Sequence, residues 1–176
     1  MVSPVRAIHT LMKYETHTNF LPVEPFQHIK DFILEEDFPW RRRDSMVYGG
    51  KKNQMFFTYS FYNEMNPSSE FYEPLIIPIL KKLNSVAPIQ VRTNMLISSL
   101  FNKSSWHTDY DYKCKTAILY LNDCDGGTEF KIDGKIIFIK AEANKIVVFD
   151  TKILHRAVTS KEEPIRYILN FNYFTK

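Results

Sequence analysis

The chain has 176 residues, of which 44% are hydrophobic and 15% aromatic, so it is long enough for one domain with a real core and does not have the composition of a disordered polypeptide. Its net charge of +3 and pI near 8.7 are mildly basic, which argues only weakly for an anionic partner. No apolar run is long enough to cross a bilayer and the N-terminal segment lacks the apolar stretch of a secretory signal, so we expect a cytoplasmic protein with no membrane segment.

The two cysteines, Cys114 and Cys124, form no CxxC pair and predict no disulfide framework. Their number and spacing favour a reducing compartment.

The N-terminal half predicts helices and short strands. Val5–Met12 fits either an edge strand or a short helix. Apolar residues recur at helical spacing over Pro25–Asp37, and Pro39 predicts that this helix has ended, because the residue before a proline avoids helical dihedrals. Met46–Tyr48 and the aromatic-rich Met55–Tyr62 predict strands.

A second helix is predicted from four apolar residues spaced four apart, at Phe71, Leu75, Ile79 and Leu83. We expect it to pack on the outside of a sheet and to bend at Pro78, which cannot donate a helical hydrogen bond.

Three consecutive arginines, Arg41 to Arg43, follow the first helix. They fit a solvated loop or, alternatively, a rim that meets an acidic or phosphorylated substrate. We expect the N-terminal segment together with the Arg41–Gly50 stretch to form a lid that faces the substrate.

From Ile89 onward the pattern predicts strands throughout. Asp133-Gly134 lies between two apolar runs and predicts a two-residue hairpin. Short strands at such spacing indicate a jelly roll. The predicted strands are Gln90–Phe101, Thr116–Leu121, Thr128–Ile132, Lys135–Lys140, Lys145–Phe149, His155–Thr159 and Ile165–Phe174.

Within this half, His107 and Asp109 stand two residues apart and His155 lies far downstream. On or beside a strand, His107 and Asp109 point to the same face. Two imidazoles and one carboxylate are the ligand set of non-haem Fe(II) oxygenases. Arg166 lies in an apolar strand, where an unpaired guanidinium is costly to bury. It pairs either with a structural carboxylate or with the carboxylate of a co-substrate, which a guanidinium binds through two parallel hydrogen bonds.

Residues 89–174 resemble the catalytic core of the Fe(II)- and 2-oxoglutarate-dependent dioxygenases, specifically the prolyl-4-hydroxylase-like branch, while the compact size and the chain ending resemble small phage-encoded and bacterial members. The resemblance implies a mainly β fold with flanking helices, a double-stranded β-helix (jelly roll) related to the cupins. It covers about half of a single domain, in which residues 1–88 support and cover a core at 89–176. The matching segments, in order, are His107-Thr108-Asp109, Tyr120-Leu121-Asn122-Asp123, Gly126-Gly127-Thr128-Glu129-Phe130, Asn144, Phe149-Asp150, His155-Arg156 and Arg166-Tyr167.

This resemblance implies that His107, Asp109 and His155 hold Fe(II) and that Arg166 binds the far carboxylate of 2-oxoglutarate. Tyr120 matches a position that assists at that carboxylate, or is a core aromatic residue. The remaining candidates for the pocket wall are Thr116, Ile118 and Asn94, with Trp106 and Tyr110 at the entrance and Gly126 and Gly127 as a structural turn at its mouth.

The implied reaction hydroxylates a substrate C–H with release of succinate and CO2, and it uses O2 with ascorbate as a candidate reductant. A peptidyl proline or another protein side chain is the first candidate substrate, followed by small molecules. A nucleic-acid demethylase is disfavoured, because that branch carries a second arginine where this chain has Asn172. A non-enzymatic cupin-like or virion module and a zinc site are the remaining alternatives, and the position of Arg166 speaks against both.

Overall fold

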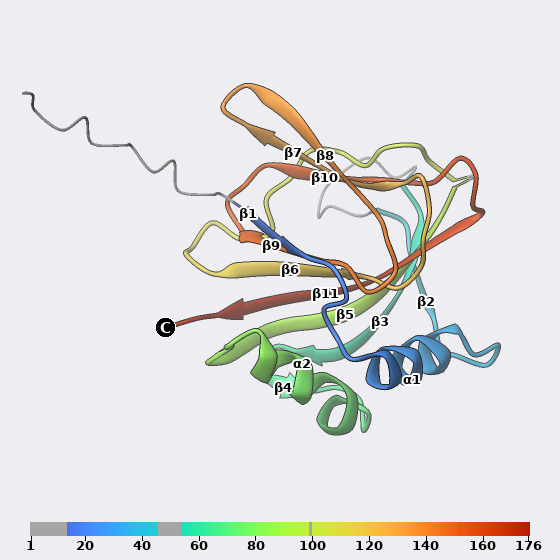
Figure 1. Cartoon of the computed structure of the whole chain (residues 1–176), viewed down its shortest axis with the longest axis vertical. Helices are drawn as coiled ribbons and strands as arrows, with labels where there is room; N and C mark the ends of the chain where they lie inside the picture. Colours follow the sequence, from blue (N-terminus) through green and yellow to red (C-terminus); the bar gives the residue numbers. More distant parts are fainter. Residues whose placement is uncertain (1–13, 46–53, 99) are drawn as a thin grey trace, which may run out of the picture.

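The computed structural model describes residues 14–45, 54–98 and 100–176, which form two antiparallel sheets and two helical segments (Figure 1). The larger sheet has the order β1-β9-β6-β11-β5-β3-β2, with β4 paired to β3, and the smaller has the order β10-β7-β8. The elements in chain order are β1 (Tyr14–His17), α1 (Val23–Leu34), β2 (Arg41–Arg43), β3 (Phe56–Asn63), β4 (Asn66–Pro67), the π-helix η1 (Tyr72–Ile76), α2 (Ile77–Lys82), β5 (Ala87–Ile97), β6 (Lys115–Tyr120), β7 (Gly127–Ile132), β8 (Lys135–Lys140), β9 (Ile146–Asp150), β10 (His155–Val158) and β11 (Ile165–Phe174).

The smaller sheet lies over one face of the larger sheet, and α1 and α2 lie against the other face (Figure 1). This arrangement confirms the predicted jelly roll with flanking helices. Each strand predicted after residue 89 is present, with ends displaced by a few residues. The predicted hairpin joins β7 to β8, and Asp133 and Gly134 have φ angles of 50° and 76°, as its turn requires.

The helices differ from the prediction at their ends. The first runs over Val23–Leu34 and therefore begins and ends earlier than the predicted Pro25–Asp37. The second is divided into η1 and α2, and the change falls at Ile77, directly before Pro78. A proline cannot donate to the preceding turn, and a widened π turn at this point accommodates that loss.

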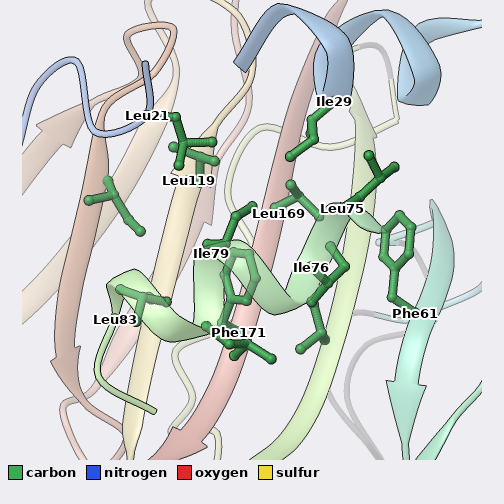
Figure 2. Close-up of a cluster of buried hydrophobic side chains, with 14 of the residues drawn as sticks. Leu21, Ile29, Phe61, Leu75, Ile76, Ile79, Leu83, Leu119, Leu169 and Phe171 are labelled. Atoms are coloured by element: carbon green, nitrogen blue, oxygen red, sulfur yellow. The ribbon is translucent and has the colours of Figure 1, made fainter. Parts of the chain in front are cut away.

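Alternate residues of the central strands form the core under the helices. In β11, Leu169 and Phe171 face Ile76 and Ile79 of the second helical segment, while Ile29 reaches the same cluster from α1 (Figure 2). Burial of this apolar surface fixes the register of β11, because a slip by one residue would turn Leu169 and Phe171 away from the helices.

The same alternation turns polar side chains toward the space between the sheets. Arg166, Asn170 and Asn172 of β11 are all buried, and they lie on the face opposite to Leu169 and Phe171. A second apolar cluster, which includes Leu96, Tyr120, Phe130, Phe149 and Ile168, fills the rest of this space. The interior between the sheets is therefore an apolar core with one polar region.

Several expectations concern the N-terminal half. Arg41 to Arg43 form the exposed edge strand β2, so the expected loop is wrong although the solvent exposure is correct. Val5–Met12, Met46–Tyr48 and most of the expected lid lie outside the described residues.

Both cysteines are free and buried. None of the helices in the described ranges is long and apolar enough to span a bilayer.

Candidate active site

Two histidines are brought face to face by backbone pairing at the edge of the smaller sheet. His107 N–H donates to the carbonyl of His155 at 3.0 Å, and His155 N–H donates to the carbonyl of His107 at 2.9 Å. This isolated bridge places residue 107 beside β10, and the two ring centroids lie 4.4 Å apart. The two residues are 48 positions apart in sequence, and the bridge explains how they meet.

Asp109 completes a cluster of three metal-ligand side chains. Its backbone N–H donates to the carbonyl of Thr151 at 3.2 Å, which anchors the turn after His107. Its Oδ1 lies 3.8 Å from Nε2 of His107 and 3.6 Å from Nε2 of His155. One ligand atom from each of the three residues lies within 4.8 Å of the others.

The second nitrogen of each imidazole fixes its tautomer. Nδ1 of His107 lies 3.0 Å from the carbonyl of Ser105, and Nδ1 of His155 lies 2.8 Å from the carbonyl of Ile153. A carbonyl oxygen only accepts, so each Nδ1 carries the proton and each Nε2 presents a lone pair to the centre of the cluster. Burial lowers the pKa of His155 further than the nearby Asp109 raises it, which favours the neutral, ligating form.

The carboxylate of Asp109 is held through its other oxygen. Oδ2 accepts hydrogen bonds from Oγ1 of Thr116 at 2.7 Å and from Nδ2 of Asn172 at 2.8 Å. Burial alone raises the pKa of Asp109, but the interactions with His155, with the Thr116 hydroxyl, with His107 and with Arg92 together outweigh this and hold it below its ordinary value. Oδ1 is therefore charged and directed at the two Nε2 atoms.

The three side chains fit a divalent transition metal. Nitrogen and oxygen ligands lie about 2.1 Å from such ions, so adjacent ligand atoms are about 3 Å apart, and a small closing movement brings the triad to that spacing. Two neutral imidazoles and one carboxylate on one side of an ion leave its other positions open for a co-substrate. The three residues present thus suit Fe(II).

Arg166 is a buried guanidinium in the same cavity. Its side chain is 1% exposed, its Nη1 donates to the carbonyl of Gly127, and its Nε has no hydrogen-bond partner within the described ranges. No carboxylate in the described residues forms an ion pair with it, so the structural-carboxylate alternative finds no support there. Burial lowers its pKa, although the nearby Tyr120 acts in the opposite direction. A guanidinium in this state fits the carboxylate of 2-oxoglutarate.

The cavity that joins Arg166 to the metal triad is narrow, with a volume of about 30 Å³. A molecule as large as 2-oxoglutarate enters only if lining side chains move. Asn94 and Ile118 line it. Thr116 and Tyr120 do not line it: Thr116 donates from its hydroxyl to Oδ2 of Asp109 at 2.7 Å, and the fully buried Tyr120 donates from its hydroxyl to Oγ1 of Thr128 at 2.8 Å.

The residues expected at the entrance and mouth of the pocket pack against other side chains or against the backbone. Trp106 stacks on the guanidinium of Arg156, with 4.2 Å between Cζ and the ring centroid, and Tyr110 packs on Tyr112. A Cβ on Gly126 would lie 2.8 Å from the carbonyl carbon of Thr159, so this position excludes any side chain. These close backbone contacts fit the prediction that Gly126 and Gly127 form a turn and do not bind a ligand.

Sequence reasoning missed four polar residues of the site. Arg92, Thr128 and Asn170 line the cavity, and Asn172 holds Asp109. Alternation along β5 and β11 could have found three of them, since Arg92 shares a face with Asn94, and Asn170 and Asn172 share a face with Arg166; Thr128 lies on β7 and has no such signal.

No known protein-family model matches the chain, and no curated protein matches it in sequence. Solved structures do match it. A prolyl-4-hydroxylase from Pseudomonas putida superposes with a TM-score of 0.70 at 13% identity, covering 93% of each chain. A 2-oxoglutarate-Fe(II) oxygenase family member from Burkholderia pseudomallei has a TM-score of 0.71 at 10% identity, covering 92% of this chain and 85% of that one.

A prolyl hydroxylase from Trichoplax adhaerens, solved with a peptide fragment of the hypoxia inducible factor oxygen degradation domain, has a TM-score of 0.67 at 14% identity and covers 92% of this chain and 83% of that one. At such identities the likeness concerns the fold. The chain therefore has the jelly-roll fold of the Fe(II)- and 2-oxoglutarate-dependent oxygenases, in the form shared with the prolyl-4-hydroxylases.

Proposed function

We propose that the protein is an Fe(II)- and 2-oxoglutarate-dependent dioxygenase that hydroxylates a C–H bond of its substrate. The observation that carries this proposal is Arg166, a buried guanidinium without a carboxylate partner in the described residues, in the same cavity as His107, Asp109 and His155. A structural zinc site does not need this costly charge, and a binding module needs it only if its ligand is an anion.

Bound together, Fe(II) and 2-oxoglutarate supply O2 activation coupled to release of succinate and CO2. The residues of the chain do the rest. His107, His155 and Oδ1 of Asp109 ligate the metal, and Arg166 orients the co-substrate through its far carboxylate. Tyr120 lies beside Arg166, with its ring centroid 5.9 Å from Cζ, and supports the guanidinium rather than the metal. The apolar residues between the sheets keep water out of the cavity.

For the substrate, we propose a peptide, with a prolyl side chain as the first candidate and a small molecule as the second. Two of the similar structures are prolyl hydroxylases, and one of them holds a peptide. A demethylase acting on nucleic acid is less well supported, because Asn172 stands where that branch has an arginine and is engaged by Asp109.

The test is succinate release from 2-oxoglutarate by purified protein with Fe(II) and O2, measured without a second substrate. We expect slow turnover by the wild type and none by His107→Ala or Arg166→Ala. His28→Ala removes an exposed histidine far from the triad in sequence and serves as the matched control, with wild-type turnover. Replacement of Fe(II) by Zn(II) abolishes turnover if the chemistry is oxidative. Equal release by wild type and His107→Ala would show that the proposal is wrong.

A further inference from the structure

A polar groove runs along the face of the larger sheet that also carries the metal cavity. It has a volume of about 440 Å³, and we call it the arginine groove; its wall includes Arg41 and Arg43 of β2, Thr58 and Ser60 of β3, and Gln90 and Arg92 of β5. Strand register pairs Arg41 with Thr58 and Thr58 with Asn94, which lines the metal cavity. Paired residues in adjacent strands project to the same face, so groove and cavity are neighbours.

The charge in this groove is one-sided. Three arginines line it, and no aspartate or glutamate belongs to its described wall. Uncharged groups of the wall bond to one another: Gln90 donates to Asn63 at 2.8 Å, and Ser68 donates to the hydroxyl of Ser60 at 3.2 Å. Within the described ranges no carboxylate forms an ion pair with Arg41, Arg43 or Arg92, since the arginine ion pairs there belong to Arg42 and Arg156.

Arg92 connects the two spaces, because it lines both the arginine groove and the metal cavity. Its Nε is shielded from solvent and has no hydrogen-bond partner among the residues described. Burial lowers its pKa and Arg43 adds to this effect, while Asp109 and Tyr110 oppose it. Asp109 is not its ion-pair partner, because Oδ2 of Asp109 accepts from Thr116 and Asn172 and Oδ1 faces the two histidines.

We propose that the arginine groove binds an acidic peptide segment of the substrate, with one carboxylate on Arg92 beside the reacting C–H bond and further negative charge at Arg41 and Arg43. This proposal rests on the proposed function and specifies its substrate class. A guanidinium binds a carboxylate through two charge-assisted hydrogen bonds, which offsets the cost of its burial.

The groove volume of about 440 Å³ and the spread of its arginines over β2 and β5 favour a peptide over a free small anion, which would contact only part of the wall. The wall also disfavours a nucleic acid, because single strands are bound through stacking on exposed aromatic rings. Phe56 is the one aromatic residue of the described wall, and it is 3% exposed.

The test uses three proline-centred peptides of equal length, whose flanking residues are Glu, Gln or Lys. Their affinity for protein loaded with Mn(II) and 2-oxoglutarate without O2 is measured by fluorescence anisotropy. We expect the Glu peptide to bind about tenfold more tightly than the Gln peptide, and the Lys peptide to bind least.

The double variant Arg41→Gln/Arg43→Gln should lose about fivefold in affinity for the Glu peptide and none for the Gln peptide. Both arginines are exposed, so their loss has little effect on stability. Arg42→Gln is the matched control. It removes one of the three charges of the same strand, but Arg42 is outside the groove wall and donates to Asp44 at 2.8 Å, so the preference should persist.

Equal affinities for the three peptides, absence of binding by all of them, or an unchanged preference in the double variant would overturn the inference. The inference would also be overturned if a single-stranded oligonucleotide or free glutamate displaced the labelled Glu peptide at a lower concentration than the unlabelled Glu peptide does. Succinate release by the wild type without any peptide tests the proposed function separately, so the two failures are distinguishable.

Discussion

At the scale of single residues, the two oxygens of Asp109 have different tasks. Oδ1 faces the imidazoles, whereas Oδ2 accepts from Thr116 and Asn172. Asn172 also donates to Oγ1 of Thr116 at 2.9 Å, so the three groups form a closed network. Such a network restricts rotation of the carboxylate and keeps it in position for the metal.

Thr116→Val should therefore weaken metal binding about tenfold, because the carboxylate loses one of the two hydrogen bonds that orient it. Titration calorimetry with Mn(II) measures the effect. Thr93→Val is the matched control: Thr93 is also a fully buried threonine of the larger sheet, but it donates to the carbonyl of Ile168 at 2.9 Å and away from the metal. An equal loss of affinity in both variants would show that the effect is general destabilisation.

The sequence identified the residues that converge at the centre, His107, Asp109, His155 and Arg166, through their order and their likeness to a known family. It did not identify Asn172 as a support of Asp109. That role depends on the register of β11 against β6, which pairs Asn172 with Thr116. Sequence alone shows that a strand alternates, but which residues of two strands stand opposite each other is decided by packing.

At the scale of elements, Glu129 connects β7 to two segments of the chain: the one that leads to His107 and the one that begins at His155. This buried carboxylate accepts from Nζ of Lys103 at 2.6 Å and from Nε of Arg156 at 2.7 Å. Lys103 belongs to the segment that leads to His107, and Arg156 follows His155 and lies under Trp106. Glu129 thus links the two segments that carry the histidines.

Glu129→Gln should lower the free energy of unfolding by about 1–3 kcal/mol at pH 7, because both cations lose their counter-charge. Burial raises the pKa of Glu129, but Lys103 and Arg156 outweigh this and hold it below its ordinary value. A depressed folded-state pKa stabilises the fold above the unfolded value of about 4.3, and that contribution is lost as the pH falls through the folded-state value. Urea unfolding should therefore show a difference between variant and wild type that shrinks below about pH 4.

A difference that stays constant between pH 7 and pH 3 would contradict this account of Glu129. Glu142→Gln is a suitable control, since Glu142 forms an ion pair with Lys145 at 2.8 Å but its side chain is 48% exposed, against 10% for Glu129. It should change stability by less than about 1 kcal/mol.

Local sequence predicted some elements well. The β7–β8 hairpin was predictable because its turn needs two residues with positive φ, and Asp133-Gly134 supplies them. The strand β1 was not predicted, because Tyr14–His17 has no apolar alternation and is mostly exposed. It exists through pairing with β9, a contact about 130 positions away that no local pattern reports.

At the scale of the whole molecule, the two faces of the larger sheet divide stability from chemistry. One face packs under α1 and α2 (Figures 1 and 2). The other face carries the polar residues of the cavity and the arginine groove. The predicted strands after residue 89 form most of both sheets of the jelly roll. The strands β1 and β3 of the N-terminal half join the larger of the two sheets. The metal cavity is lined by residues after position 89 only, whereas β2 and β3 of the N-terminal half form part of the wall of the arginine groove.

The central claim is that one diacid bridges the metal held by His107, Asp109 and His155 and the guanidinium of Arg166. Calorimetric titration of 2-oxoglutarate into Mn(II)-loaded protein tests it most directly. We expect binding by the wild type that depends on the metal, and a loss of about 30-fold or more in Arg166→Lys, which keeps the charge but not the paired hydrogen bonds. Binding of equal strength without metal, or in Arg166→Lys, would contradict the account.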